Sequence, residues 1–345
     1  MKTTIEKIKV LFGTSLLLTL LTTVLRTISL LTVFDSDPGY YQKGAFLPYL
    51  QKALLLASVV YLLIELFLLK KETLPAALPT ASTPMGIASL LCGFAYVCAV
   101  VLLYLNNHVK PTLLFFMILL TGLLSTGYFL YDALCPSAKK IPATPLFGLA
   151  VVVNLLLLVI KEYLDYSVAL NVPHKILVFF SFIVFALYFI QELRFAAGNA
   201  QPKFRFISGC IAFLLCTVSA IPGMIAHYAG VLHGVNFLIY DLMNLTFASY
   251  ILIRLGISIK YARSLAAVSD EAGQATASEA PAATESAKED GDGDEESKSA
   301  SASASASESA SASESEENDD AAKSTRDKEP DETDETADSG ESTPC

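Results

Sequence analysis

The sequence predicts an all-α polytopic membrane protein with eight transmembrane helices, arranged as four hairpin repeats and followed by a disordered C-terminal tail. Three observations support this fold class. Eight apolar runs follow one another, one short motif recurs four times, and the composition changes abruptly near residue 267. Together they divide the chain into a transmembrane domain, residues 1–267, and an acidic tail, residues 268–345.

The apolar runs are about 20 residues long and almost lack charge, a length that spans a hydrocarbon core about 30 Å thick. The helices are predicted at about 9–33, 48–69, 85–105, 111–133, 145–164, 174–193, 204–227 and 235–257. Buried helices of a soluble protein are the alternative, and eight such runs with short polar links argue against it. The first run follows three lysines, as in a secretory signal, but it continues to Val33 without a small-residue cleavage pattern, so we predict an uncleaved helix.

A tyrosine followed four positions later by a charged residue recurs near the end of every second apolar run. The copies, which lie 67, 60 and 62 residues apart, are Tyr61/Glu65, Tyr128/Asp132, Tyr188/Glu192 and Tyr250/Arg254. A glycine opens the apolar run 40 to 48 residues before each tyrosine, at Gly13, Gly86, Gly148 and Gly209. A fixed period of this size indicates one structural unit used four times, here a helical hairpin.

Lysine and arginine gather at one set of helix ends, which predicts the orientation. Thirteen bases fall at these ends and four at the opposite ends. Because positive charge stays on the cytoplasmic side, both termini are predicted to be cytoplasmic, with the protein in the cell membrane. Residues 1–267 carry a net charge of +9 and residues 268–345 carry −19, which sum to the −10 of the whole chain.

The charged residues of the four motifs form the first candidate site. Residues at i and i+4 share a helix face, so each charge stacks on its tyrosine. An acid near the C-terminal end of a helix is disfavoured by the helix dipole unless a base is close. If the hairpins close into a ring, Arg254 is expected to pair with one or two of Glu65, Asp132 and Glu192. A structural belt that fixes helix depth and a cytoplasmic vestibule or gate are the two interpretations.

Arg26, Lys161 and Asp241 form the second candidate site, an intramembrane polar or ion-pair site. Each lies 13 residues from a landmark of the repeat, so all three are expected at one level, about 20 Å from the cytoplasmic ends. An unpaired charge inside a membrane costs about 2.5–3.5 kcal/mol, so pairing is expected. A solute or ion site is the functional interpretation. A structural ion pair, or snorkelling to the nearby outer surface, is the alternative.

The histidines fall on the predicted outer side, at His108, His174, His227 and His233, together with Asp35, Asp37 and Asp165. Such a set is able to bind a metal or to sense external pH. The spacing of His227 and His233 fits no helical metal motif, and ordinary interface residues are the alternative. The six cysteines form no disulfide or zinc pattern. We therefore predict no metal site.

Common catalytic and nucleotide-binding motifs are absent from the sequence, so neither a cofactor nor a nucleic-acid partner is predicted. Asp35-Ser36-Asp37 resembles the acidic pair in the first external loop of membrane glycosyltransferases that use lipid-linked donors. The resemblance covers three residues and implies an enzyme that acts on a lipid-linked substrate. Those enzymes carry a long external loop or domain, whereas this loop is about 14 residues long. Asp-Pro-Gly after the pair is also typical of a turn.

The tail has almost no large apolar residues and cannot bury a core, so disorder is predicted. Residues 299–315 mostly alternate serine and alanine with inserted glutamates. Negative charge repels the anionic inner leaflet, so the tail is expected to extend into the cytoplasm. Either it is a solvated brush, or it binds a basic cytoplasmic partner.

Three functions follow from these patterns. The first is a non-catalytic membrane scaffold or sensory module, whose only required partner is the lipid bilayer. The second is a small-solute or ion transporter or channel, which parallel repeats and buried charges favour. The third is the enzyme of lipid-linked substrates. Arg26, Lys161 and Asp241 would have to converge on a wet cavity in a transporter, whereas a scaffold needs no continuous polar path.

Overall fold

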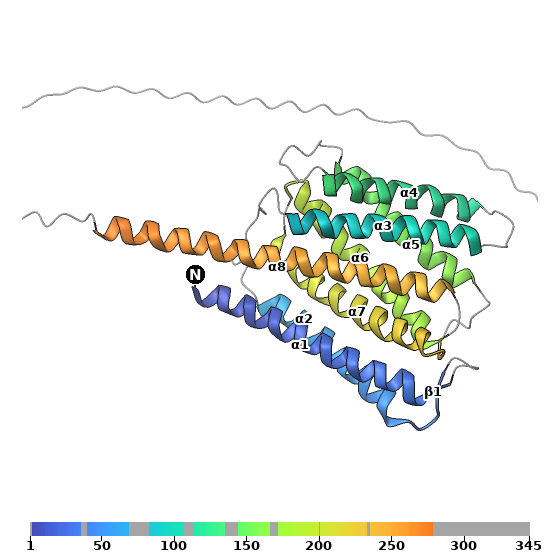
Figure 1. Cartoon of the computed structure of the whole chain (residues 1–345). Coiled ribbons are helices and arrows are strands. Elements are labelled where there is room, and N and C mark those ends of the chain that lie inside the picture. The colour runs from blue at the N-terminus through green and yellow to red at the C-terminus, as the bar shows by residue number, and fades with distance from the viewer. Residues whose placement is uncertain are drawn as a thin grey trace, which may run out of the picture. The chain divides into compact units, whose positions relative to one another are not determined.

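The computed structural model describes residues 2–35, 40–68, 83–106, 113–134, 144–165, 172–199, 201–232 and 235–278 (Figure 1). Within these ranges, eight helices are long and apolar enough to cross a membrane. They are α1 (Lys2–Val33), α2 (Phe46–Leu68), α3 (Thr83–Asn106), α4 (Leu113–Leu134), α5 (Thr144–Leu164), α6 (Pro173–Ala196), α7 (Pro202–Tyr228) and α8 (Val235–Ser278). Two short antiparallel strands, β1 (Phe34–Asp35) and β2 (Tyr40–Tyr41), join α1 to α2. The predicted class, a helical membrane protein with eight spans, is confirmed at this level.

Two helices are longer than the sequence indicates. α1 begins at Lys2 rather than near residue 9, and α8 continues to Ser278 rather than ending near residue 257. Apolar runs predict only the part of a helix that lies in lipid, whereas residues 258–278 are rich in alanine, which is a strong helix former in water as well. The predicted tail therefore begins with helical residues, 268–278, and from residue 279 it lies outside the described residues.

The helices run alternately up and down, so that the start of each odd-numbered helix lies beside the end of an even-numbered one. Glycine contacts join α3 to the end of α4, α5 to the end of α6, and α7 to α8 near Leu255. We call this end the near end, and the opposite end, which holds β1 and β2, the far end (Figure 1).

α7 is the central helix. It packs against α6 and α8 on one side and against α1 and α2 on the other. α3, α4, α5, α6 and α8 follow one another around a ring that α3 closes by packing on α8. The share of residues that are buried in the most hydrophobic stretch of a helix is 83% for α7 but only 17% for α2. α2 is therefore the most peripheral of the described helices.

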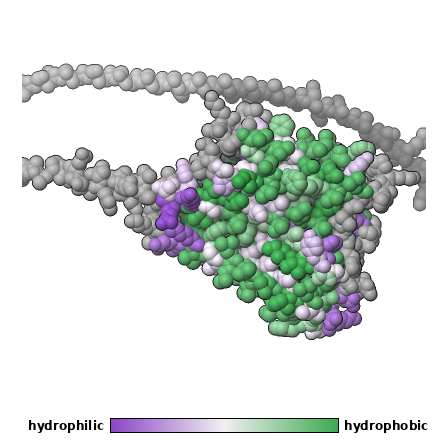
Figure 2. Space-filling model, in the orientation of Figure 1, coloured by the Kyte–Doolittle hydropathy of each residue, from purple (hydrophilic) through white to green (hydrophobic). Residues whose placement is uncertain are grey.

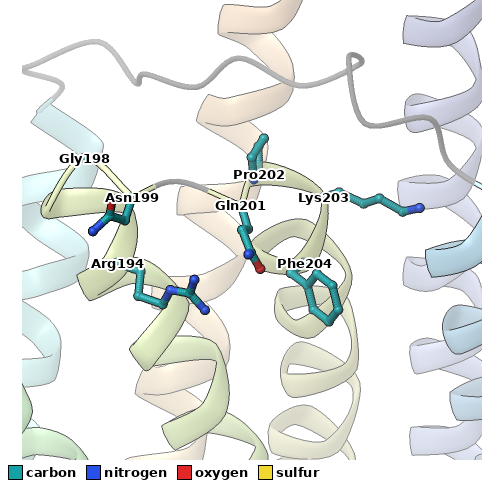
Figure 3. A pocket seen from close by; sticks show the side chains of 7 residues that line it. All are labelled: Arg194, Gly198, Asn199, Gln201, Pro202, Lys203 and Phe204. Atoms are coloured by element: carbon teal, nitrogen blue, oxygen red, sulfur yellow. The ribbon is translucent and has the colours of Figure 1, made fainter. Parts of the chain in front are cut away.

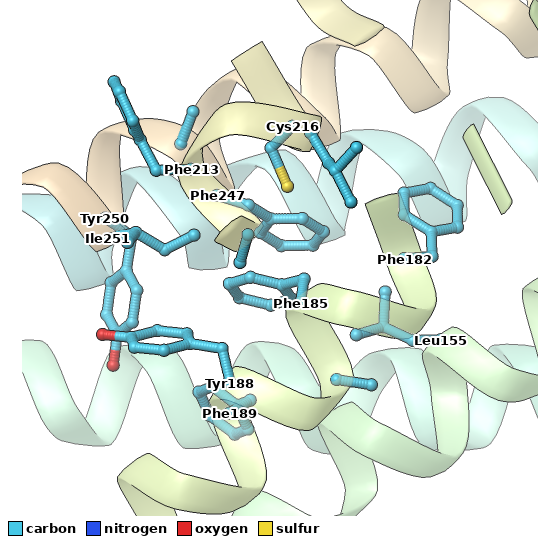
Figure 4. Close-up of a cluster of buried hydrophobic side chains, with 14 of the residues drawn as sticks. Leu155, Phe182, Phe185, Tyr188, Phe189, Phe213, Cys216, Phe247, Tyr250 and Ile251 are labelled. Carbon is cyan, nitrogen blue, oxygen red and sulfur yellow. The ribbon is translucent and has the colours of Figure 1, made fainter. Parts of the chain in front are cut away.

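Aromatic side chains fill the centre of the bundle (Figure 4). Phe185 of α6 stacks on Phe247 of α8, with ring centroids 4.0 Å apart and planes 6° apart. Phe182 and Phe189 contact the same cluster from one turn before and after Phe185. Cys216 of α7 lies beside these rings and is fully buried. Offset and edge-on packing of this kind is favourable and leaves the interior dense.

The outer surface of the bundle is apolar. Large hydrophobic side chains are exposed on every long helix from α1 to α7, among them Leu17, Phe67, Phe94, Leu120 and Phe180. Figure 2 shows hydrophobic residues over most of the visible side, with hydrophilic residues gathered toward the ends. An apolar surface of this extent is typical of a protein embedded in lipid.

One close contact recurs at equivalent positions of three of the four sequence repeats. A Cβ atom added at Gly86, Gly148 or Gly209 would meet the residue that directly follows the charged residue of the same repeat, at 3.2 Å, 2.2 Å and 3.1 Å for the nearest atom. These partners are Ala133, Leu193 and Leu255. Gly13 of the first repeat has no such neighbour within 4 Å. Packing alone does not single out four hairpins, because α4 packs on α5 and α6 packs on α7 as well.

Replacing Phe185 by alanine should destabilise the bundle by about 3 kcal/mol, because a buried ring leaves a cavity that its neighbours fill only in part. Phe180→Ala is the matched control on the same helix, since Phe180 is 55% exposed and Phe185 is fully buried. The free energy of unfolding is measured by titrating the detergent-solubilised protein with SDS. Equal effects of the two substitutions would contradict this packing.

Candidate functional site

Two clusters of buried polar side chains lie at opposite ends of the bundle. At the near end the Arg254 cluster comprises Ser89, Asp132, Tyr188, Glu192, Arg205, Arg254 and Ser258. At the far end the His174 cluster comprises Arg26, His174, Ser219, Asp241, Asn244 and Ser181. The aromatic centre lies between them.

Arg254 is the hub of the first cluster. Its Nη2 donates to Oδ2 of Asp132 at 2.6 Å, and its Nη1 lies 3.6 Å from Oε2 of Glu192. Arg205 approaches Glu192 from α7, with its Nε 2.7 Å from Oε1. The hydroxyl of Ser89 donates to Oδ2 of Asp132 at 2.6 Å. The cluster therefore joins α3, α4, α6, α7 and α8.

The charges of this cluster balance. Two guanidinium groups face two carboxylates, and each of the four residues is only 4–5% exposed. Charges removed from water cost several kcal/mol each unless they are paired and hydrogen-bonded. Tyr250 and Phe195 add aromatic faces to Arg254 and Arg205, at 4.8 Å and 4.4 Å from the guanidinium carbons. Removing any one charge would leave an uncompensated charge in the interior.

The tyrosines of the last three motifs point into the bundle. Tyr188 donates its hydroxyl hydrogen to Glu192, four residues later on the same helix. Tyr128 and Tyr250 pack edge-on against phenylalanine rings, with centroid distances of 5.4 Å to Phe189 and 5.7 Å to Phe129. All three tyrosines are buried.

The first motif differs from the other three. Tyr61 is half-buried, and its hydroxyl lies 3.4 Å from Oγ1 of Thr14 on α1. Glu65 is also half-buried and takes no part in the contacts of the Arg254 cluster. The reason is the peripheral place of α2, which packs on α1 and α7 and not on the ring that carries Asp132. Of the four predicted positions, Asp132, Glu192 and Arg254 meet and Glu65 does not.

His174 links the two predicted residues Arg26 and Asp241 at the far end. Nη2 of Arg26 lies 3.0 Å from Nδ1 of His174, and Nε2 of His174 lies 3.2 Å from Oδ2 of Asp241. Because arginine offers only donors, Nδ1 must accept, and the imidazole then carries a proton on Nε2, facing the carboxylate. Arg26, His174 and Asp241 are 3%, 0% and 1% exposed. α1, α6 and α8 are thus joined through one imidazole.

A row of hydrogen bonds continues inward from Asp241. The hydroxyl of Ser219 donates to Asp241 at 3.5 Å, the amide of Asn244 donates to Ser219 at 3.4 Å, and Ser181 donates to the amide oxygen of Asn244 at 3.0 Å. These residues come from α6, α7 and α8, which pack together around the row. The buried polar region therefore extends from Asp241 toward the aromatic centre through hydroxyl and amide groups.

Lys161 lies apart from Arg26 and Asp241. Its ammonium group contacts Oε1 of Glu162 at 2.9 Å and the hydroxyl of Tyr240 at 3.4 Å. Tyr240 also donates to Glu162 at 2.6 Å. α5 packs on α4 and α6, so its lysine faces a different side of α8 from the one that meets Arg26. The three predicted residues share the far end but form two separate groups.

Gly223 explains how the His174 cluster fits against α7. A Cβ atom at this position would lie 2.6 Å from Cγ of Asp241 and 2.7 Å from Cε1 of His174. Real side chains do not approach so closely, so only glycine fits here. Pro222 precedes this glycine inside α7, and the helix continues through both residues to Tyr228.

Sequence reasoning missed His174, Arg205 and Gly223 as members of these clusters. In the sequence, His174 is one of the histidines interpreted as interface residues, and Arg205 is one of the thirteen bases at the predicted cytoplasmic helix ends. The available signal was position, since Arg205 is the second base of α7 and lies 13 residues after Glu192, near the end of α6. Among the described residues, no three His, Cys, Asp or Glu side chains are placed to hold a metal ion. Asp37, His108 and His233 lie outside the described residues.

No family model, no curated protein and no solved structure matches this chain. The candidate site is therefore defined by its own contacts.

Gly223→Ala should destabilise the protein by about 1–3 kcal/mol, because the added methyl group forces Asp241 and His174 apart. Gly127→Ala is the matched control, since a Cβ atom there would meet nothing within 4 Å. That control should be neutral or slightly stabilising, because alanine is the better helix former. Thermal unfolding in detergent measures both effects, and a neutral Gly223→Ala variant would contradict the described packing.

Proposed function

We propose that this protein is a non-catalytic membrane scaffold or sensory module. One observation carries the proposal: the buried charges of the Arg254 cluster are neutralised by one another, Asp132 and Glu192 against Arg205 and Arg254. Charges that move an ion or solute must face a wet path for part of the cycle. Charges that pair within the bundle instead fix the helices relative to one another.

The dense centre supports the same proposal. Between the two clusters, Phe185 and Phe247 stack at 4.0 Å, and Tyr96 and Phe129 pack beside them. A protein that holds partners in place gains from such rigidity, because its binding surface keeps one geometry. The proposed function therefore requires an intact bundle and involves neither catalysis nor transport.

We further propose four hairpin repeats in the cell membrane, with both termini in the cytoplasm. The near-end glycine contacts at equivalent places in three repeats support the repeat. The uneven distribution of lysine and arginine supports the orientation. In this arrangement the acidic tail of residues 268–345 extends into the cytoplasm and binds a basic partner, since it carries 24 acids and 5 bases.

A transporter of a small solute or ion is the second candidate, and one observation favours it. The polar row from Arg26 through Asp241 to Ser181 runs inward from the far end and involves four helices, α1, α6, α7 and α8. In this alternative, helix movement would open the row to water and would expose the residues beside it.

Two of the three cysteines that are buried in the described part of the chain distinguish these functions. Cys92 and Cys216 are fully buried, Cys92 near the Arg254 cluster and Cys216 beside Ser181 of the polar row. Each test variant keeps one of these two cysteines and carries serine at the other five cysteine positions. If the protein is a scaffold, the remaining cysteine of the variant in liposomes should not react with a small water-soluble maleimide until SDS unfolds the protein. Labelling is measured by mass spectrometry with reagent on both sides of the membrane.

Gln42→Cys is the positive control, because Gln42 is exposed in the turn before α2. A cysteine there should react within the first minutes. Rapid labelling of Cys216 in the folded protein, at a rate comparable with that of the control, would overturn the scaffold and favour the transporter.

A further inference from the structure

A pocket of about 670 Å³ lies at the near end, where α6 ends and α7 begins (Figure 3). Its lining includes Arg194, Asn199, Gln201, Lys203 and Phe204. Neither of the two clusters described above contributes to this lining. The pocket is therefore a separate feature, built from the turn between two helices.

The lining is cationic. It contains one arginine and one lysine and no acidic residue. Within the described part of the chain, no ion pair involves Arg194 or Lys203. Arg205 comes only two residues after Lys203 and is paired with Glu192 in the interior. The bases of this turn thus divide into one that is neutralised inside and two that line the pocket.

Figure 3 shows how the lining side chains lie. The guanidinium group of Arg194 points from α6 toward the side of α7 that carries Gln201 and Phe204, whereas the Lys203 side chain extends along the other flank of α7. Arginine forms paired hydrogen bonds with phosphate oxygens, and lysine adds a charge on a flexible stem. The two cations belong to different helices, and the Lys203 side chain extends away from Arg194 (Figure 3).

The helix ends add to the positive character of the turn. The carbonyl groups that end α6 are already occupied, because the amides of Ala197, Gly198 and Asn199 donate to them. At the start of α7, Gln201 makes no side-chain cap and Pro202 has no amide hydrogen to offer. The amides that follow are directed at the turn, where a helix favours an anion.

The depth of the pocket indicates the source of the anion. Arg194 lies within three residues of the end of one apolar span, and Lys203 lies at the second residue of the next, so both are at the level of the lipid headgroups. Phe204 is 50% exposed and provides an apolar surface beside the cations. A phospholipid offers both a phosphate group and an apolar chain at this level.

We propose that this pocket binds the phosphate group of an anionic phospholipid. The site goes beyond the proposed scaffold function. With both termini in the cytoplasm, the pocket faces the cytoplasmic leaflet, and only this choice of leaflet rests on the proposed orientation. Each cation near a membrane surface contributes about 1 kcal/mol toward an anionic lipid, so losing two should weaken binding about thirtyfold.

The test uses the full chain in a neutral detergent and three probes: phosphatidylglycerol, phosphatidylcholine and inorganic phosphate. Native mass spectrometry measures the binding of each probe. The variant Arg194→Gln/Lys203→Gln removes both pocket cations. Lys260→Gln/Arg263→Gln is the matched control, because it removes two exposed bases from the same end of the bundle, outside the pocket.

The proposal expects phosphatidylglycerol to bind more tightly than phosphatidylcholine, with about a thirtyfold loss in the pocket variant and less than a twofold loss in the control. Binding of inorganic phosphate that depends on the two pocket residues, without preference for phosphatidylglycerol, would overturn the lipid as the source of the anion. Equal effects of the two variants, or no effect of either, would overturn the site. These measurements are made in detergent and do not depend on whether the protein is a scaffold or a transporter.

Discussion

Arg254 lies between two carboxylates, and all three side chains are almost completely buried. Its guanidinium group contacts Asp132 of α4 and Glu192 of α6, and Arg205 of α7 completes the balance of charge. A charge without a partner would cost several kcal/mol in such a place. Helices that carry these residues are therefore held to one arrangement, because each alternative packing separates at least one pair.

At the far end, a histidine between an arginine and an aspartate holds the helices together. There the imidazole of His174 lies between Arg26 and Asp241, and Gly223 lets α7 approach the pair closely. Between the two ends, phenylalanine rings of α6 and α8 fill the space by packing against one another. Lipid does not drive helices together through a hydrophobic effect, so close packing and polar pairing must do so. The structure meets this need with polar groups at both ends and dense packing between them.

The membrane class and the number of helices could be predicted from the sequence, because each span needs a long apolar run and the sequence contains eight such runs. It also pointed to Arg254 beside Asp132 and Glu192, since equivalent positions of a repeat fall at one level of the bundle. It did not show which helices of that level touch. Glu65 lies on a peripheral helix, and Lys161 faces another side of α8, although both share the expected depth. Depth follows from counting residues, whereas lateral position depends on packing between distant segments.

Several members of the clusters have no local signature. His174 follows a proline at the start of α6 and resembles any interface residue, and Gly223 resembles any helix-ending glycine. Their roles depend on residues that are distant in the sequence. Arg26 lies 148 positions before His174, and His174 lies 49 positions before Gly223. The helical extension of α8 to Ser278 was hidden for another reason, since alanine-rich sequence is compatible with both a helix and a disordered tail.

The central claim is that Asp132 and Arg254 hold the near end together, and a double-mutant cycle tests it most directly. The free energy of unfolding is compared for the original protein, Asp132→Asn, Arg254→Gln and the double variant, all in the same detergent. Each single change should cost about 3–5 kcal/mol because it leaves a buried charge unpaired. The double change should cost at least about 2 kcal/mol less than the sum of the single changes. Additive effects would contradict the claim that this pair fixes the bundle.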